Sequence, residues 1–319
     1  MIDCLIIGGG PAGLLAAIYL GRYLRSVCLI DAGESRAAKI PESHNYPGFF
    51  GINGLELLRR LKAQAQEYGV PSTTDRVKSL RREGESFVAS CKSGNDVNAR
   101  FVLLATGLVD HCPPIEGELA NCPSEVIRFC PICDGYEALD HRVGVLGGID
   151  AGSKKALFLR TYTEAVSLFL TDETIDTVSR GKLDENDVRI VHKPKRIKLA
   201  NECTVAILTE SGERHELDAL YPALGCTVRS ELATALGASC TENGNLLVDD
   251  HQRTSVEGLY AAGDVVTDLH QLSVAFGHAA IAATDIHNRL PSNPRPTKKF
   301  GPNSVAEPRG VQICATSER

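Results

Sequence analysis

Two cysteines, Cys130 and Cys133, have two residues between them in the segment RFCPICDGYE, and theirs is the spacing best suited to chemistry. In a chain with strand–helix–strand patterns, Cys-x-x-Cys is typical of a redox-active disulfide. Pro131 stiffens the segment, and Asp134 directly follows the second cysteine. A turn or helix start of this kind lowers the pKa of a thiol and makes the thiolate the reactive form. The pair therefore predicts thiol–disulfide chemistry.

Two other interpretations of the pair are half of a zinc site and two unrelated thiols. A structural zinc site needs a second ligand pair at similar spacing, and neither His141 nor Cys122 supplies one. The rest of the eleven cysteines are scattered along the chain, unlike the dense framework of a small secreted protein. We expect most of them to be buried as small apolar side chains.

A glycine-rich strand–turn–helix–strand unit occurs twice. The first copy is DCLIIGGGPAGLLAAIYLGRYLRSVCLID, from Asp3, and the second is RVGVLGGIDAGSKKALFLRTYTEAVSLFL, from Arg142. In such a βαβ unit, the N-terminus of the helix can hold a phosphate. The repeat predicts an α/β fold with two Rossmann-like nucleotide-binding domains.

The first copy has every residue of a dinucleotide fingerprint. Gly8 permits the tight turn, Gly10 lets a pyrophosphate approach the backbone, and Gly13 lets helix and strand pack closely. Asp31 ends the second strand, where a carboxylate binds a ribose hydroxyl pair. The predicted cofactor-binding residues of this copy are Gly8, Gly10, Pro11, Ala12, Gly13 and Asp31.

The second copy departs from this pattern at two places. Ile149 replaces the middle glycine, so a β-branched side chain stands where a diphosphate should lie. The following strand leads into TDETID, which contains acids and no arginine, whereas a 2′-phosphate needs a cation. NADH is less strongly excluded, because an acid can bind a ribose. We expect this copy to keep the fold without the ligand; a distorted but working site is the alternative.

Bulk composition narrows the classes of partner. A net charge of −6 without a basic patch argues against nucleic acid. The sequence has no run of 18 apolar residues, so no membrane span is expected. The N-terminus enters a strand directly without a visible secretory signal, which predicts a cytoplasmic location.

The chain resembles a low-molecular-weight, bacterial-type thioredoxin reductase over about residues 1–290. The motifs that carry the resemblance are, in order, GGGPAG at Gly8, SHNYPGF at Ser43, LLATG at Leu103, CPICDG at Cys130 and TSVEGLYAAGDV at Thr254. The resemblance implies a flavin domain in two parts, residues 1–114 and 246–290, an inserted domain with the cysteines, residues 115–245, and a tail, residues 291–319.

The resemblance also implies residue roles. FAD would be held by the first glycine fingerprint together with Asn45 near the isoalloxazine, Thr106 and Gly107 close to the cofactor, Gly263 and Asp264 at the ribityl–phosphate region, and Gln271 at the flavin edge. Cys133 would face the flavin, and Cys130 would exchange with the disulfide of a thioredoxin-like protein or a small molecule. Asp134 would act as acid and base, because a leaving thiolate must be protonated. A homodimer is expected.

Three histidines, His44, His270 and His278, are expected to be surface or packing residues, because the sequence names no partner for them. The tail from Pro291 has the composition of a linker or disordered end. Alternatively, it could bring Phe300 or Cys314 to a dimer partner or over the disulfide.

The altered second fingerprint argues against NADPH use. In this the chain resembles the pyridine-nucleotide-independent members, which include ferredoxin-dependent flavin thioredoxin reductases and relatives that carry a second flavin. A second flavin and a ferredoxin-type donor therefore stay open, although net acidity counts against an acidic ferredoxin. A basic surface that could receive one, which we expect to be only an ordinary solvated face, consists of Lys154, Lys155, Arg160, Lys193, Lys195 and Arg196.

Three functions are compatible with these motifs. The leading one is a flavin-dependent disulfide reductase that uses a donor other than NADPH. The second is a dithiol oxidase that passes electrons to oxygen; because such oxidases commonly have histidine after the second cysteine, Asp134 favours the reductase. The third is a flavin-binding redox sensor without turnover.

Overall fold

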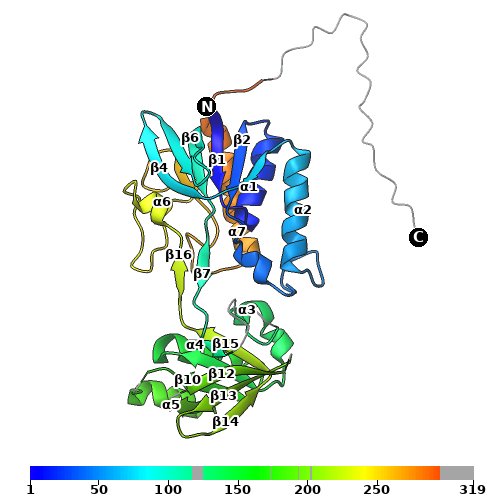
Figure 1. The fold of residues 1–319 in the computed structure, drawn as a ribbon, viewed down its shortest axis with the longest axis vertical. Helices are drawn as coiled ribbons and strands as arrows, with labels where there is room; N and C mark the ends of the chain where they lie inside the picture. Colours follow the sequence, from blue (N-terminus) through cyan, green and yellow to red (C-terminus); the bar gives the residue numbers. More distant parts are fainter. Residues whose placement is uncertain (117–124, 173, 193, 202, 295–319) are drawn as a thin grey trace, which may run out of the picture.

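The structure, a computed structural model, describes residues 1–116, 125–172, 174–192, 194–201 and 203–294. Two α/β lobes are stacked along the long axis of the molecule and are joined by a narrow link (Figure 1). We call the lobe that contains the N-terminus the first lobe and the other the second lobe. The predicted α/β class is confirmed, and each lobe contains a parallel, Rossmann-like set of strands.

The first lobe is built on a seven-stranded sheet of order β3-β2-β1-β6-β5-β4, with β17 beside β6. These strands are β1 (Ile2–Ile7), β2 (Val27–Asp31), β3 (Ser72–Thr74), β4 (Val77–Glu83), β5 (Ser86–Cys91), β6 (Asp96–Leu104) and β17 (Leu259–Ala261). The strand β17 returns to this sheet from far along the chain and pairs in parallel with β6.

Three helices cover one face of this sheet: α1 (Pro11–Arg22), α2 (Gly54–Glu67) and α7 (Leu272–Arg289) (Figure 1). Alternate residues of a strand face opposite sides. Accordingly, Cys4 and Ile6 of β1 pack in the core under the helices, whereas Leu5 and Ile7 pack in the core on the other side. An apolar strand buried on both faces is typical of a parallel sheet.

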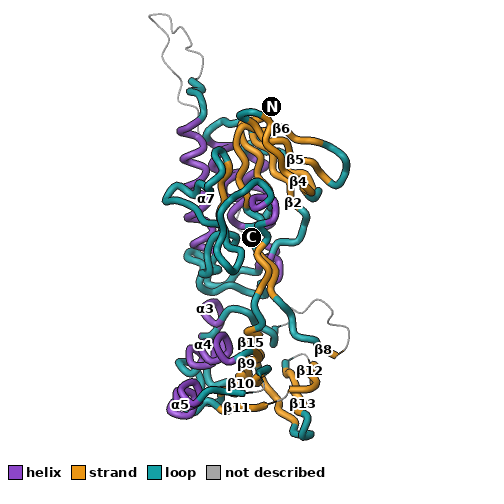
Figure 2. Tube along the Cα trace, turned by 90° about the vertical axis from the view of Figure 1, so that its left-hand side faces the viewer, coloured by secondary structure: helices purple, strands orange, loops and turns teal. Residues whose placement is uncertain are grey.

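The second lobe has three layers (Figure 2). Its central sheet, of order β11-β10-β9-β15, contains β9 (Val143–Gly147), β10 (Val166–Leu170), β11 (Arg189–His192) and β15 (Ala219–Ala223). Helices α4 (Ile149–Leu159) and α5 (Thr177–Glu185) lie on one side. On the other lies the sheet β14-β13-β12-β8, made of β8 (Ile115–Glu116), β12 (Pro194–Asn201), β13 (Thr204–Thr209) and β14 (Arg214–Leu217).

The link between the lobes is an antiparallel ladder of two short strands, β7 (Leu108–Asp110) and β16 (Cys226–Val228). Four short helices complete the described elements: η1 (Arg36–Lys39), α3 (Pro131–Asp134), η2 (Tyr136–Ala138) and α6 (Glu231–Thr234). Of these, α3 carries the cysteine pair and lies where the second lobe faces the first (Figure 1). Among the described helices, none has both the length and the apolar character needed to cross a bilayer.

Candidate active site between the two lobes

A cavity of about 890 Å³ runs from the glycine turn of the first lobe to the cysteine pair of the second. It is lined by all but one of the predicted site residues: Gly8, Gly10, Pro11, Ala12, Asp31, Asn45, Thr106, Gly107, Cys130, Cys133, Asp134, Gly263, Asp264 and Gln271. The exception, Gly13, packs behind the turn, where an added Cβ would lie 1.9 Å from the carbonyl oxygen of Gly8. The fold thus gathers residues from distant parts of the chain around one space.

The first glycine turn has the shape that a dinucleotide needs. Gly8 has φ of +111°, and a Cβ there would lie 2.2 Å from the carbonyl oxygen of Ala105, so only glycine fits. Helix α1 begins at Pro11 after Gly10, and no side chain caps it. Its free N–H groups can therefore bind a pyrophosphate. Asp31 accepts a hydrogen bond from Gly9 N at 3.1 Å beside the turn. These residues fit FAD.

Arg36 is a residue of this cavity that sequence reasoning missed. Its guanidinium forks onto Asp110, with distances of 2.7 and 2.9 Å, and also donates to Asp264 at 3.2 Å. Asp110 belongs to the link strand β7, and Asp264 is a predicted FAD residue. A single arginine at the start of the short helix η1 belongs to no periodic sequence pattern, so only the fold identifies it.

Cys130 and Cys133 form a disulfide with a Cα–Cα distance of 5.3 Å. Cys130 is the N-cap of α3, and Pro131 occupies the first helical position, which proline favours because its missing N–H is not needed there. The N–H of Cys133 donates to the carbonyl of Cys130 at 2.9 Å. The cysteines thus lie at a helix start.

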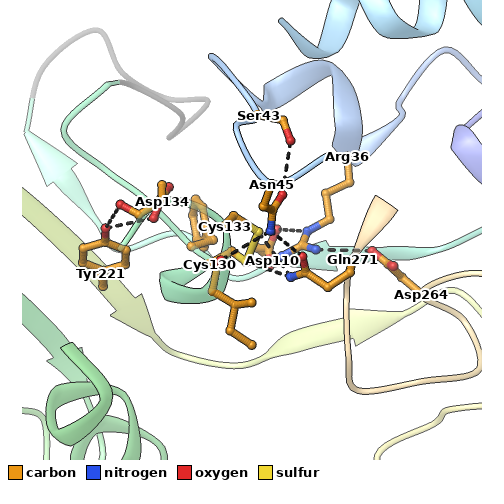
Figure 3. The surroundings of a disulfide bond; sticks show 12 residues. Arg36, Ser43, Asn45, Asp110, Cys130, Cys133, Asp134, Tyr221, Asp264 and Gln271 are labelled. Atoms are coloured by element: carbon orange, nitrogen blue, oxygen red, sulfur yellow. Dashed lines mark hydrogen bonds and ion pairs between the residues drawn. A yellow bond between two sulfur atoms is a disulfide. The ribbon is translucent and has the colours of Figure 1, made fainter. Parts of the chain in front are cut away.

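Side chains of the first lobe reach this disulfide (Figure 3). The amide nitrogen of Gln271 lies 3.3 Å from Cys130 Sγ and 3.4 Å from Cys133 Sγ. Asn45 donates to Gln271 Oε1 at 2.8 Å and to the carbonyl of Ile132 at 3.3 Å. These contacts bring two predicted flavin-site residues onto the redox pair itself.

Asp134 lies on the other side of the pair, against the second lobe. Burial raises the pKa of its carboxyl to about 6, although a hydrogen bond from Tyr221 acts in the opposite direction. The Tyr221 hydroxyl donates to Asp134 Oδ1 at 2.8 Å, and Tyr221 itself is fully buried on β15. A carboxyl with a pKa of about 6 can hold or release a proton near neutral pH. Sequence reasoning missed Tyr221.

Lys155 corrects one sequence expectation. This lysine was expected on a solvated face. Its ammonium instead donates to the carbonyls of Phe129 and Pro222, at 3.1 and 2.6 Å. Burial lowers its pKa to about 8. Arg160 also turns to backbone carbonyls of its own lobe, and Lys193 lies outside the described residues. Lys155 and Arg160 therefore depart from the solvated face expected for this set, and the tail residues Phe300 and Cys314 are likewise outside the described part of the chain.

The second glycine turn differs from the first in the group that binds the N-terminus of the helix that follows it. The N–H of Ile149, the first residue of α4, donates to Asp172 Oδ2 at 2.7 Å. Asp172 is the first acid of TDETID, and Asp176 from the same segment caps α5. The Ile149 side chain packs against the core of the second lobe. A carboxylate of the protein therefore stands at the helix N-terminus, where a dinucleotide would place its phosphate.

The histidines occupy three different places. His44 lies between two carboxylates, with Nδ1 at 3.2 Å from Glu137 and Nε2 at 3.4 Å from Glu42. Glu137 comes from the second lobe, so this partner was not visible in the sequence. His270 lines the cavity, and burial lowers its pKa. His278 lies on α7, where burial also lowers its pKa.

Comparison with known proteins places this architecture in a family. The model of the family described as pyridine nucleotide-disulphide oxidoreductase matches residues 2–282. The chain belongs to this family. It is 27% identical to the thioredoxin reductase of Helicobacter pylori over 309 residues, which cover 91% of this chain and 99% of that protein.

Solved structures agree with this assignment. The crystal structure of HlmI superposes with a TM-score of 0.85 at 28% identity and covers 90% of this chain and 92% of that one. The thioredoxin reductase of Streptococcus pyogenes gives a TM-score of 0.83 at 26% identity, with 90% and 97% covered. The predicted membership of the low-molecular-weight thioredoxin reductase group is confirmed. The chain is a thioredoxin reductase-like, flavin-dependent disulfide oxidoreductase, for which the family implies FAD.

Proposed function

We propose that this enzyme exchanges electron pairs between FAD, the Cys130–Cys133 pair and the disulfide of a thioredoxin-like protein or a small molecule, and that its electron donor is not NADPH. The observation that carries the second part is the hydrogen bond from Ile149 N to the Asp172 carboxylate. An incoming pyrophosphate would have to displace this carboxylate and would meet its negative charge. The names of the relatives support thioredoxin as one substrate.

The residues of the first glycine turn, with Arg36 and Asp264, would hold FAD in the cavity. When bound there, FAD supplies the two-electron redox chemistry that the side chains of this chain lack. The cavity continues to the disulfide, where Asn45 and Gln271 orient the cysteine pair against the first lobe.

The reduced cysteine pair would act in two exchange steps. The Cys130 thiolate attacks one sulfur of the substrate disulfide, so that a mixed disulfide forms and one substrate sulfur leaves as a thiolate. The Cys133 thiolate then attacks Cys130 Sγ, which closes the Cys130–Cys133 bond and releases the second substrate sulfur. The substrate gains two electrons and two protons. Asp134, with its pKa of about 6, holds a proton that can pass to a leaving thiolate.

An anaerobic titration tests the choice of donor. The oxidised protein is mixed with excess NADPH, then with NADH, while the flavin absorbance is followed; dithionite serves as the positive control. We expect no rapid loss of absorbance with either nucleotide and complete loss with dithionite. Rapid reduction by NADPH would overturn the proposal that its site is blocked.

A second assay tests the chemistry at the cysteines. Dithionite-reduced protein, freed of reductant, is mixed with oxidised thioredoxin or a small aromatic disulfide, and released thiols are counted. Cys130→Ser should abolish thiol release. Unchanged release in that variant would refute the assigned role. Release of no thiols by the unmodified protein would favour the sensor, whereas rapid oxygen consumption with added dithiols would favour the oxidase.

A further inference from the structure

The side chains that contact the disulfide form a chain of hydrogen bonds that begins in the first lobe (Figure 3). We propose that Gln271 is a catalytic residue, which donates its amide N–H groups to the thiolates of Cys130 and Cys133, and that Asn45 and Ser43 are positioning residues that keep its amide in this orientation. This inference rests on the proposed exchange chemistry of the cysteines. It assigns to Gln271 a role toward sulfur in addition to its expected place at the flavin edge.

A backbone carbonyl defines the donor-to-acceptor direction of this series of hydrogen bonds. The carbonyl of Ile132 can only accept, so the Asn45 atom 3.3 Å from it must be the amide nitrogen. The same nitrogen has a second hydrogen, which it donates to Gln271 Oε1 at 2.8 Å. Because the oxygen of Gln271 is engaged in this way, the group that remains to face the sulfurs is its NH₂.

Ser43 secures the other end of Asn45. Its hydroxyl donates to Asn45 Oδ1 at 3.3 Å, and only 4% of the Ser43 surface is exposed. A reversed Asn45 amide would place its oxygen against both the Ile132 carbonyl and Gln271 Oε1, so that acceptors would face acceptors. The arrangement from Ser43 through Asn45 to Gln271 is therefore self-consistent in one direction only.

The side chain of Gln271 is not used to cap the helix that it precedes. It is the N-cap residue of α7, but its side chain makes no capping hydrogen bond to that helix. Many N-cap side chains are used to satisfy the first N–H groups of their helix. Here the amide points to the sulfurs instead, at 3.3 and 3.4 Å.

The chemical consequence depends on the redox state of the cysteines. The sulfurs of a disulfide are weak acceptors, whereas a thiolate is charged and takes a stronger hydrogen bond. A donor that binds the charged form more strongly lowers the pKa of the thiol. Gln271 would therefore increase the fraction of thiolate after reduction, which is the nucleophile in exchange.

The decisive measurement is the pH dependence of cysteine alkylation. The flavin-loaded protein is reduced with dithionite, treated anaerobically with iodoacetamide at a series of pH values, and digested so that mass spectrometry reports the modification of the peptide with Cys130 and Cys133. In Gln271→Met, which keeps the length of the side chain and removes its donors, the midpoint should rise by about one pH unit. Alkylation below the midpoint should be about tenfold slower.

The matched control is Gln64→Leu, because Gln64 is an exposed glutamine on α2, away from the disulfide. It should leave the midpoint unchanged. If Gln271→Met does not retain flavin, Gln271→Leu serves as a second donor-free variant. An unchanged midpoint in a flavin-loaded, donor-free variant would overturn the inference, even if flavin retention or spectrum changed, since that pattern means that Gln271 serves only the flavin.

A double-mutant cycle tests the positioning role of Asn45. In Asn45→Asp the carboxylate cannot donate to Gln271 Oε1 and would instead attract its NH₂, which turns the amide oxygen toward the sulfurs. The midpoint should rise by about one unit or more, although the added charge contributes to this rise. In the double variant Asn45→Asp with Gln271→Met, the shift of the midpoint should be clearly smaller than the sum of the shifts in the two single variants.

Full additivity in this cycle would show that Asn45→Asp acts only through its charge, and would refute the relay. The role of Gln271 toward sulfur and the exchange chemistry of the cysteines can be tested separately. If the midpoints do not move while reduced protein still releases thiols from a disulfide, only the role of Gln271 is wrong. If Cys130→Ser continues to turn over, the exchange chemistry itself is wrong.

Discussion

The two lobes contain the same strand–turn–helix unit but use the start of the helix differently. In the first lobe, α1 follows Gly10 without a side-chain cap, and its turn opens into the cavity. In the second lobe, Asp172 accepts the N–H of Ile149 at the start of α4. Under the proposed function, the second lobe keeps a nucleotide fold in which a carboxylate of the protein stands where the anion of a ligand would lie.

Each lobe also contains a buried tyrosine that donates to an aspartate, but the pKa of the aspartate shifts in opposite directions in the two lobes. In the first lobe, Tyr260 donates to Asp285 at 2.5 Å, and Arg253 donates to the same carboxylate; although burial opposes them, these partners lower the pKa of Asp285. In the second lobe, burial dominates, and the pKa of Asp134 rises to about 6. The first pair is suited to structure, and the second to proton transfer.

The largest effect is expected at the two glycine turns. Gly13→Ala places a Cβ 1.9 Å from a backbone carbonyl oxygen, whereas Gly152→Ala meets the end of the Leu168 side chain at 2.8 Å. Since a backbone cannot yield as a side chain does, Gly13→Ala should lose most of its flavin and about 2–3 kcal/mol of unfolding free energy. Gly152→Ala should keep its flavin. Flavin bound per chain and urea unfolding measure both; equal flavin loss would contradict the comparison.

A smaller effect is expected when the tyrosine of a tyrosine–aspartate pair is replaced, and it should be visible in the pH dependence of thiol release. Tyr221→Phe removes a hydrogen bond that lowers the pKa of Asp134, so this pKa should rise above about 6, by up to about one unit. If protonated Asp134 supplies the proton to the leaving thiolate, the rate of thiol release falls as the pH rises through this pKa. The falling limb should therefore move to higher pH in single-turnover reduction of a disulfide.

Tyr260→Phe is the matched control for this shift, since it removes a tyrosine–aspartate bond in the other lobe. Its pH profile should coincide with that of the unmodified protein, although its stability should fall. A falling limb that stays in place in Tyr221→Phe would mean that Asp134 is not the proton donor.

Sequence analysis could predict the parts of this site whose cause is local. Within the first turn, Gly8 is required by its positive φ and Gly13 by the nearby carbonyl of Gly8. Cys130 and Cys133 are recognised by their spacing. Asn45 and Gln271 came from resemblance alone, which implied proximity to flavin and gave no sign of the contact with sulfur.

The remaining contacts join residues with no common local pattern. Tyr221 is separated by 87 residues from Asp134, and it reads in the sequence as one apolar residue of a buried strand. Lys155 was grouped with surface cations, because a helical lysine beside Lys154 gives no indication that its ammonium turns inward to two carbonyls. Long-range hydrogen bonds of this kind become visible only after the strands are assembled.

Removing the carboxylate at the second turn should cost little. Asp172 is exposed, and it stabilises the start of α4 by one hydrogen bond and by its charge near the helix N-terminus. Asp172→Ala should lower the free energy of unfolding by about 0.5–1 kcal/mol without changing thiol release from a disulfide. Urea unfolding in low and high salt checks this, because the charge component should shrink in high salt. A large loss of turnover would show that the second turn contributes to catalysis.

The smallest expected effect separates the contributions of Ile149 and Asp172 to the proposed block of NADPH binding. Ile149→Gly restores the glycine of the fingerprint, but the backbone N–H at this position would still donate to Asp172. No cation would be present for a 2′-phosphate. The single variant should therefore show no more flavin reduction by NADPH than the unmodified protein in the anaerobic assay. Ile149→Gly combined with Asp172→Arg removes the competing carboxylate and supplies a cation, so any gain should appear first in this double variant. If Ile149→Gly alone gains NADPH oxidation, the side chain of Ile149 is the whole barrier and the carboxylate of Asp172 is a replaceable cap.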